Sequence, residues 1–167
     1  MSVTVDVAVP AGRIPLSRAA VRDTVRSVLR AEGVRNAVLS VAFVGDRAMA
    51  AHNRHYLGRR GTTDVIAFAL ESPVAPDGAA SRTGRGSTAP ESAGVVLGDI
   101  YIAPAVARRN ARRFGSTVRE ELVRLVIHGT LHVLGHDHPE GEHRTRSPMW
   151  QRQEALVARM ARGPRRR

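Results

Sequence analysis

Five of the seven histidines lie between His128 and His143, and three of these five have the spacing of a metal site. His128 and His132 are four residues apart, so on a helix their imidazoles lie on one face, one turn apart. Gly135 permits the left-handed backbone conformation that ends a helix, and the chain can then turn back to bring in His138. Three neutral imidazoles leave one open position on a tetrahedral zinc ion, which is typical of a catalytic zinc site. The sequence therefore predicts one Zn²⁺ per chain, bound by His128, His132 and His138.

The spacing H-x-x-x-H-x-x-G-x-x-H is also that of the metzincin proteases, with one difference. Those enzymes carry a general-base Glu directly after the first His, and this chain has Gly129 there. The Glu passes a proton to the leaving amine, which is a poor leaving group without it. We therefore expect a metal site without peptidase activity, in which Gly129 leaves room beside the ion.

The other polar residues of this run have different expected roles. His136 and His143 are expected to be surface residues. Asp137 lies between two histidines and is poorly placed to bind the ion itself. We expect its carboxylate either to accept a hydrogen bond that orients an imidazole or to stabilise the turn.

The net charge of the chain is +11, and every basic residue is an arginine. Without the four arginines of the last six residues, the remainder still carries +7 of that +11. Residues 163–167 form a basic tail, but the body of the domain is basic as well. A strongly basic small domain is typical of a polyanion-binding protein, and nucleic acid is the first candidate.

A chain of 167 residues with 43% hydrophobic content supports one globular domain with a core. The lack of cysteine excludes disulfides and thiolate metal sites and is compatible with a cytoplasmic protein. The first residues resemble no secretory signal, and no apolar run approaches the roughly 20 residues that span a bilayer. We expect a cytoplasmic location and no membrane partner.

Periodicity and capping signals predict strands and helices in the order β-α-β-α-β-loop-β-α-α-α. The fold class is α+β: a four-stranded mixed sheet packed with about five to six helices, one of them a zincin-like metal helix. Thr117 and Glu120 form a capping box that starts this metal helix. Residues 71–94 are rich in Ser, Gly, Ala and Pro and are expected to form a mobile surface insertion. The expected strands are 3–9, 38–44, 64–69 and 95–102, and the helices begin near 17, 46, 104, 117 and 148; Trp150, Leu156, Val157 and Met160 are expected to pack in the last helix.

These motifs resemble the YbeY family of single-strand-specific endoribonucleases, also called rRNA maturation factors. The family motif is close to H-G-x-L-H-L-x-G-x-D-H, and residues 128–138 match it with Val133 in place of a Leu. Further matches are Asn53 and Tyr56, the segment 63–68, the strand 97–102 and the pair Gln153-Glu154, so the resemblance covers nearly the whole chain.

The resemblance implies that residues 1–162 form one metal-dependent endoribonuclease domain. Its substrate would be single-stranded RNA, notably the 3′ end of 16S rRNA on the small ribosomal subunit, with a further role in ribosome quality control. The family usually has a basic residue where this chain has Leu57. Arg54, Arg59 or Arg60 is then expected to bind the scissile or flanking phosphates.

The sequence leaves the group that moves protons open: water alone, an RNA 2′-hydroxyl or a remote acid such as Asp99. Two other functions also remain. A zincin-like metalloprotease would explain only the histidine spacing. A non-catalytic, zinc-containing ribosome assembly factor would explain the charge and the metal but leave the open coordination position unused.

Overall fold

Four strands form the sheet in the part of the chain that the structure describes. The computed structural model describes residues 2–71, 94–139 and 141–161. Within them the strand order is β1-β2-β4-β3, in which β1, β2 and β4 are parallel and β3 is antiparallel to β4. The predicted mixed sheet is thus confirmed. The strands are β1 (Ser2–Ala8), β2 (Asn36–Phe43), β3 (Val65–Glu71) and β4 (Val96–Ile102).

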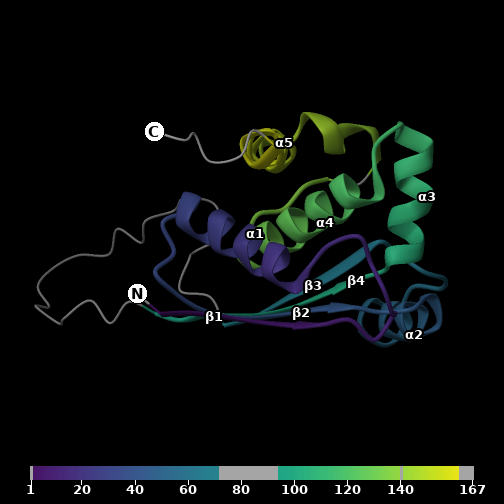
Figure 1. Cartoon of the computed structure of the whole chain (residues 1–167), viewed down its shortest axis with the longest axis horizontal. Coiled ribbons are helices and arrows are strands. Elements are labelled where there is room, and N and C mark those ends of the chain that lie inside the picture. The colour runs from purple at the N-terminus through teal and green to yellow at the C-terminus, as the bar shows by residue number, and fades with distance from the viewer. Residues whose placement is uncertain (1, 72–93, 140, 162–167) are drawn as a thin grey trace, which may run out of the picture.

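Helices cover mainly one face of this sheet. Helices α1 and α4 lie side by side on that face, and α5 lies outside them, farther from the strands (Figure 1). Helix α2 lies at one end of the sheet and packs Met49 with Ile66 from the opposite face. The expected order of elements is confirmed, with a short 3₁₀ helix that the sequence did not reveal. The helices are α1 (Arg18–Ala31), α2 (Asp46–Leu57), α3 (Pro104–Phe114), α4 (Val118–Val133), the 3₁₀ helix η2 (Gly141–Arg146) and α5 (Pro148–Ala161).

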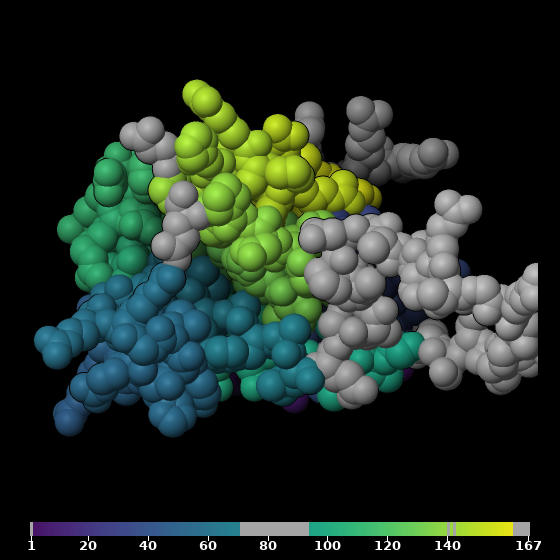
Figure 2. Space-filling view, turned by 180° about the vertical axis from the view of Figure 1, so that it is seen from behind, coloured from purple at the N-terminus to yellow at the C-terminus, as the bar shows by residue number. Residues whose placement is uncertain are grey.

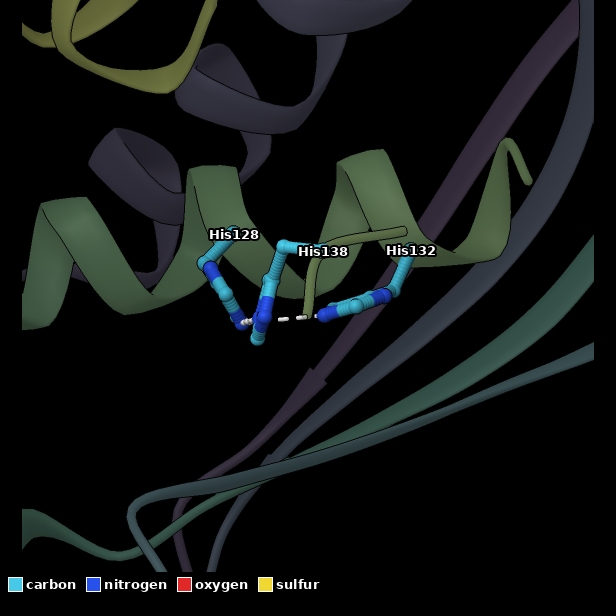
Figure 3. A group of neighbouring side chains, drawn as sticks. All are labelled: His128, His132 and His138. Carbon is cyan, nitrogen blue, oxygen red and sulfur yellow. Dashed lines mark hydrogen bonds between the residues drawn. The ribbon is translucent and has the colours of Figure 1, made fainter. Parts of the chain in front are cut away.

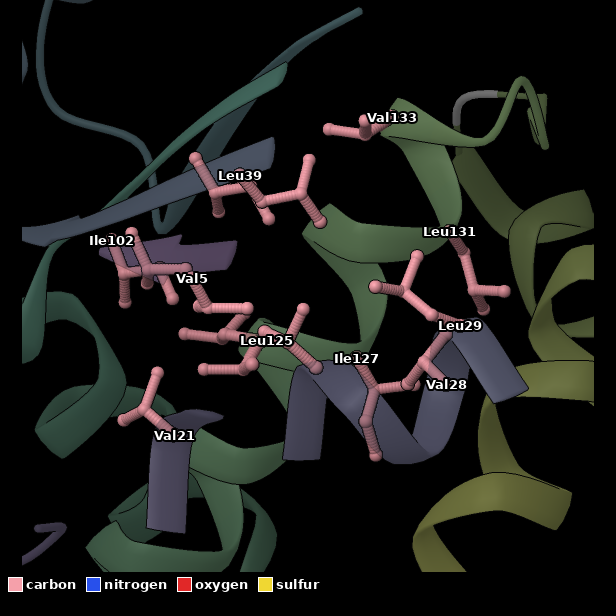
Figure 4. Close-up of a cluster of buried hydrophobic side chains, with 14 of the residues drawn as sticks. Val5, Val21, Val28, Leu29, Leu39, Ile102, Leu125, Ile127, Leu131 and Val133 are labelled. Carbon is pink, nitrogen blue, oxygen red and sulfur yellow. The ribbon is translucent and has the colours of Figure 1, made fainter. Parts of the chain in front are cut away.

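The core lies between the sheet and the pair α1 and α4 (Figure 4). Alternate residues of each strand point toward it, because successive side chains of a strand face opposite sides. Val5 and Leu39, which are register partners on β1 and β2, are both buried. Leu29 of α1 and Leu131 of α4 close the core from the helical side. Helix α4 also contacts α3, α5, β3 and β4, so the helix that carries two of the histidines is held on several sides.

Glycine occurs at two points where helix α4 and strand β4 pack against each other. A Cβ atom at Gly129 would lie 2.6 Å from Ile100 Cγ2, and one at Gly98 would lie 2.5 Å from Val133 Cγ1. Ordinary carbon contacts are about 3.5–4.0 Å long. The two glycines therefore set the spacing between the metal helix and the sheet.

The predicted insertion, the basic tail and the packing of the last helix can be compared with the structure only in part. The predicted insertion 71–94 lies outside the described residues except at its ends, and its first residue, Glu71, belongs to β3. The basic tail 163–167 also lies outside them. In α5, Leu156 is buried as expected, whereas Trp150 is only half-buried. Among the helices that the structure describes, none is long and apolar enough to cross a membrane.

Candidate metal centre

The three predicted histidines come together in space. His128 and His132 project from α4, and His138 reaches them from the loop that follows (Figure 3). The Nε2 atom of His128 lies 3.0 Å from Nε2 of His132 and 3.4 Å from Nε2 of His138. A tetrahedral zinc ion with Zn–N bonds of about 2.0–2.1 Å places its ligand nitrogens about 3.3–3.4 Å apart. The spacing of the three nitrogens therefore fits a single metal ion.

Local signals in the sequence position these side chains. The capping box that starts α4 is present: Thr117 Oγ1 accepts a hydrogen bond from Glu120 N, and Glu120 Oε2 accepts one from Thr117 N. At the other end, Gly135 has φ +89°, which confirms the predicted left-handed turn. His136 N donates to Leu131 O across this turn. The chain thus reverses directly after the second histidine and carries the third one back.

A chain of polar contacts that the sequence analysis missed orients His128. Gln153 is 1% exposed, and its Oε1 lies 2.7 Å from His128 Nδ1. Gln153 Nε2 donates to Glu154 Oε1, so Gln153 Oε1 is left as the acceptor. His128 must then carry its proton on Nδ1 and present the Nε2 lone pair to the cluster. Arg124 continues the chain of contacts by pairing with both Glu154 and Glu121.

His132 and His138 also direct their Nε2 atoms toward Nε2 of His128. His138 Nδ1 lies 3.1 Å from the carbonyl oxygen of Pro139, so Nδ1–H can donate to it and leave Nε2 free. Burial removes water from the His128 imidazole and, together with the charge of the neighbouring His132, lowers the pKa of His128 from 6.5 to about 3. Burial, with the neighbouring His138, also lowers the pKa of His132. These two imidazoles are therefore neutral at pH 7, the form that binds a metal ion.

The neighbouring polar residues lie outside the cluster. Asp137 Oδ1 accepts a hydrogen bond from His138 N at 2.8 Å, which favours the turn-stabilising role over the orienting role. His136 Nε2 lies 3.0 Å from Glu32 Oε2, at the end of α1. His143 is exposed on η2, as expected.

One expectation about the chemistry is wrong, and one of the open alternatives for the group that moves protons is disfavoured. Asp99 was a candidate acid, but Gly98 and Ile100 face α4, so Asp99 points to the opposite face of the sheet and accepts a hydrogen bond from Ser40. Gly129 was expected to leave room beside the ion. A side chain there would instead enter the space of Ile100 on β4. Glycine at this position is accounted for by helix–sheet packing.

The arginines that were expected to bind phosphate lie near the end of α2 and in the loop that follows. Arg54, Arg59 and Arg60 are all exposed. The loop is fixed by Asn53, whose Nδ2 donates to Gly61 O at 2.9 Å. These arginines lie on a different segment from the three histidines, and their role stays a prediction.

Comparisons with known proteins show which family this chain resembles. The family model described as "Endoribonuclease YbeY" matches residues 11–161. A protein named Endoribonuclease YbeY from Bacillus licheniformis is 36% identical over 140 residues, which are 83% of this chain and 84% of that protein. A protein of the same name from Frankia alni is 37% identical over 122 residues, 73% of this chain and 62% of the relative. The solution structure of a Thermotoga maritima protein shares the fold, with a TM-score of 0.52 at 20% identity, covering 98% of this chain and 100% of that one.

Proposed function

The chain belongs to the YbeY family of endoribonucleases, and on that premise we propose that it is a zinc-dependent, single-strand-specific endoribonuclease acting on ribosomal RNA. The observation that carries the proposal is that three imidazole nitrogens lie within 4.8 Å of one another, close enough to bind the same metal ion. As its particular task we propose maturation of the 3′ end of 16S rRNA on the small ribosomal subunit, together with ribosome quality control, in the cytoplasm. Residues 1–162 would form its single catalytic domain.

Zinc is the proposed metal because the donor set consists of three imidazole nitrogens. Imidazole ligands suit zinc, and copper, iron and nickel also accept them. The chain has no cysteine, so thiolate ligands play no part in the choice of metal. When bound by three histidines, zinc polarises a phosphoryl oxygen and lowers the pKa of a coordinated water from about 15.7 to about 7. With neutral ligands the site keeps its double positive charge, which favours an anionic phosphodiester over a neutral peptide.

The chain's own residues would orient and bind the substrate. Gln153 keeps the proton of His128 on Nδ1, so the Nε2 lone pair stays directed into the site. We assign the flanking phosphates to Arg54, Arg59 or Arg60, since Leu57, which is 47% exposed, cannot make the contact of the basic residue that the family usually has there. Exposed guanidinium groups on an ordered loop suit phosphate binding, because they donate in a planar fork.

A metalloprotease function is disfavoured by the position after the first histidine. In H-E-x-x-H peptidases that residue is the general base, and loss of a general base typically costs on the order of 10²–10⁴ in rate. Here the position is Gly129, packed against Ile100. An assembly factor without catalysis remains an outcome of the test.

The test is a cleavage assay with the purified, zinc-loaded protein on single-stranded RNA, duplex RNA and casein, with and without chelator. We expect cleavage of the single-stranded RNA alone, loss of cleavage with chelator and recovery with added zinc. The variant His132→Ala should lose both metal and activity, and the matched control His143→Ala should keep both. Chelator-sensitive digestion of casein would favour the protease. RNA binding without cleavage would favour the assembly factor, and full metal content in His132→Ala would overturn the ligand assignment.

A further inference from the structure

A cavity of about 430 Å³ opens beside His128. It lies where the end of α3, the start of β3 and the segment of η2 and α5 meet. Figure 2 shows the face on which α3 (green), the segment after α2 (blue) and the C-terminal segment (light green to yellow) come together. We call it the His128 cavity; among the residues that line it are Asp64, Phe114, Arg144, Thr145, Trp150 and Gln153.

Arg144 presents an unused donor at this cavity. Its Nε atom is buried and has no hydrogen-bond partner among the described residues. Leaving a buried donor of a charged group unsatisfied is costly, and an anion bound to this guanidinium would offset that cost. The Arg144 backbone is fixed as well, because its carbonyl oxygen accepts a hydrogen bond from Ser147 Oγ at 2.7 Å.

Two aromatic rings, Trp150 and Phe114, line the cavity, and each has an arginine beside it. The guanidinium of Arg144 lies 5.8 Å from the centre of the Trp150 ring, and that of Arg113 lies 5.4 Å from the centre of the Phe114 ring. Phe114 is 68% exposed, so burial in the core does not account for it. Proteins that bind single-stranded RNA combine arginines with aromatic side chains, on which the bases stack.

The remaining charges of the cavity limit what it can bind. Arg124 pairs with both Glu121 and Glu154, so this group keeps a net charge of −1 and its cation is already occupied. Arg144 is therefore the cation that remains for a ligand among the described lining residues. Asp64 adds a carboxylate, which disfavours a second phosphate but can accept a hydrogen bond from a ribose hydroxyl or a base amino group. One phosphate with a sugar and a base matches this set of groups.

We propose that the His128 cavity binds one nucleotide of the RNA next to the scissile phosphate, with the phosphate on Arg144 and the base against Trp150 and Phe114. The inference rests on the proposed ribonuclease function and deepens it, because it assigns a substrate position beside the metal centre. The side chains act by binding, so their contribution is measurable without cleavage.

The test uses adenosine 5′-monophosphate as the probe, because it has no phosphodiester bond to cut. Trp150 is the single tryptophan of the chain, so the fluorescence of the zinc-loaded protein reports directly on the cavity. We expect the nucleotide to quench this fluorescence, and ribose 5-phosphate, which lacks a base, to leave it nearly unchanged. Loss of a charge-assisted hydrogen bond in Arg144→Gln should raise the dissociation constant by on the order of tenfold. Loss of stacking in Phe114→Ala should raise it by about fivefold or more.

The matched control is Arg146→Gln, since Arg146 is exposed on the same 3₁₀ helix and does not line the cavity. It should bind the nucleotide as the wild type does. In RNA cleavage, Arg144→Gln and Phe114→Ala should raise KM with little change in kcat. Phe114 is exposed, so its variant decides the question if Arg144→Gln does not fold.

Outcomes that overturn this inference differ from those that overturn the proposed function. Normal RNA cleavage with no quenching by the nucleotide, or with both variants equal to Arg146→Gln, would mean that the cavity has no such role while the ribonuclease function stands. Absence of RNA cleavage under every condition contradicts the proposed function itself, whatever the nucleotide does.

Discussion

Substitution of Gly129 by alanine offers a test in which two physical effects have opposite signs. Gly129 lies inside α4, where alanine is favoured over glycine by about 1 kcal/mol through helix propensity alone. The added Cβ, however, would lie 2.6 Å from Ile100 Cγ2 and 3.3 Å from Val65 Cγ2. Ile100 cannot easily move its methyl group, because a β-branched side chain is stiff at χ1 and β4 is paired on both sides. Overpacking of this kind typically costs about 1–3 kcal/mol.

We therefore expect Gly129→Ala to lower the free energy of unfolding by up to about 2 kcal/mol, since the steric cost of about 1–3 kcal/mol exceeds the gain of about 1 kcal/mol in propensity. For a domain of this size that corresponds to a fall in Tm of up to about 8 °C. Urea unfolding and thermal unfolding, both followed by circular dichroism, measure the two quantities.

The control is the same substitution in an Ile100→Ala background. Truncation of Ile100 alone should cost about 2–5 kcal/mol by leaving a cavity. In that background the methyl group of Gly129→Ala has space, so the substitution should become neutral or stabilising. A single variant Gly129→Ala that is more stable than the wild type would refute the reasoning, because helix propensity would then be the dominant effect.

Three further predictions concern the metal centre, pH and salt. Gln153→Met removes the hydrogen-bond acceptor for His128 Nδ1 and should weaken zinc binding by about 10–100-fold in a competition titration. The control Gln151→Met changes an exposed residue and should leave the affinity unchanged. Equal zinc affinities of the two variants would mean that Gln153 does not orient His128. Because the pKa of His128 is lowered to about 3 in the folded chain from 6.5, the unfolded chain binds this proton more readily between those values. The metal-free protein should therefore be most stable above pH 6.5 and lose up to about 1.4 kcal/mol per pH unit on acidification toward pH 3, and unfolding titrations of His128→Asn should show a smaller slope. The logarithm of RNA affinity should fall with the logarithm of salt concentration by about 0.7 per phosphate contact; a flat dependence in fluorescence anisotropy would mean that the charge of +11 is not used.

The parts that the sequence predicted correctly depend on local signals. The capping box at Thr117, the four-residue spacing of His128 and His132 and the turn at Gly135 each act within a few residues. Strand alternation also places Asp99 on the face opposite to Gly98 and Ile100, so the alternative of Asp99 as the acid could have been set aside from the sequence.

The parts that the sequence missed depend on packing between distant segments. Gln153 meets His128 only because α5 docks on α4, and 25 positions separate the two residues. The reason for Gly129 is a methyl group on β4, which a single sequence does not place opposite the helix. A binding role for Arg144 and Trp150 could not be predicted, because the cavity that they line is also lined by residues of α3 and by Asp64 beside β3.

The polar contacts that reach from His128 through Gln153 to Glu154 and Arg124 give α5 a second role besides covering the core. Metal affinity and the docking of α5 share the contact to His128, so by thermodynamic linkage each must strengthen the other. Amide hydrogens of α5 should therefore exchange with solvent more slowly when the metal is bound, even though no ligand lies on that helix. Loss of the metal should loosen the packing of α5 on α4, so the amide exchange rate of α5 reports whether the metal centre is filled.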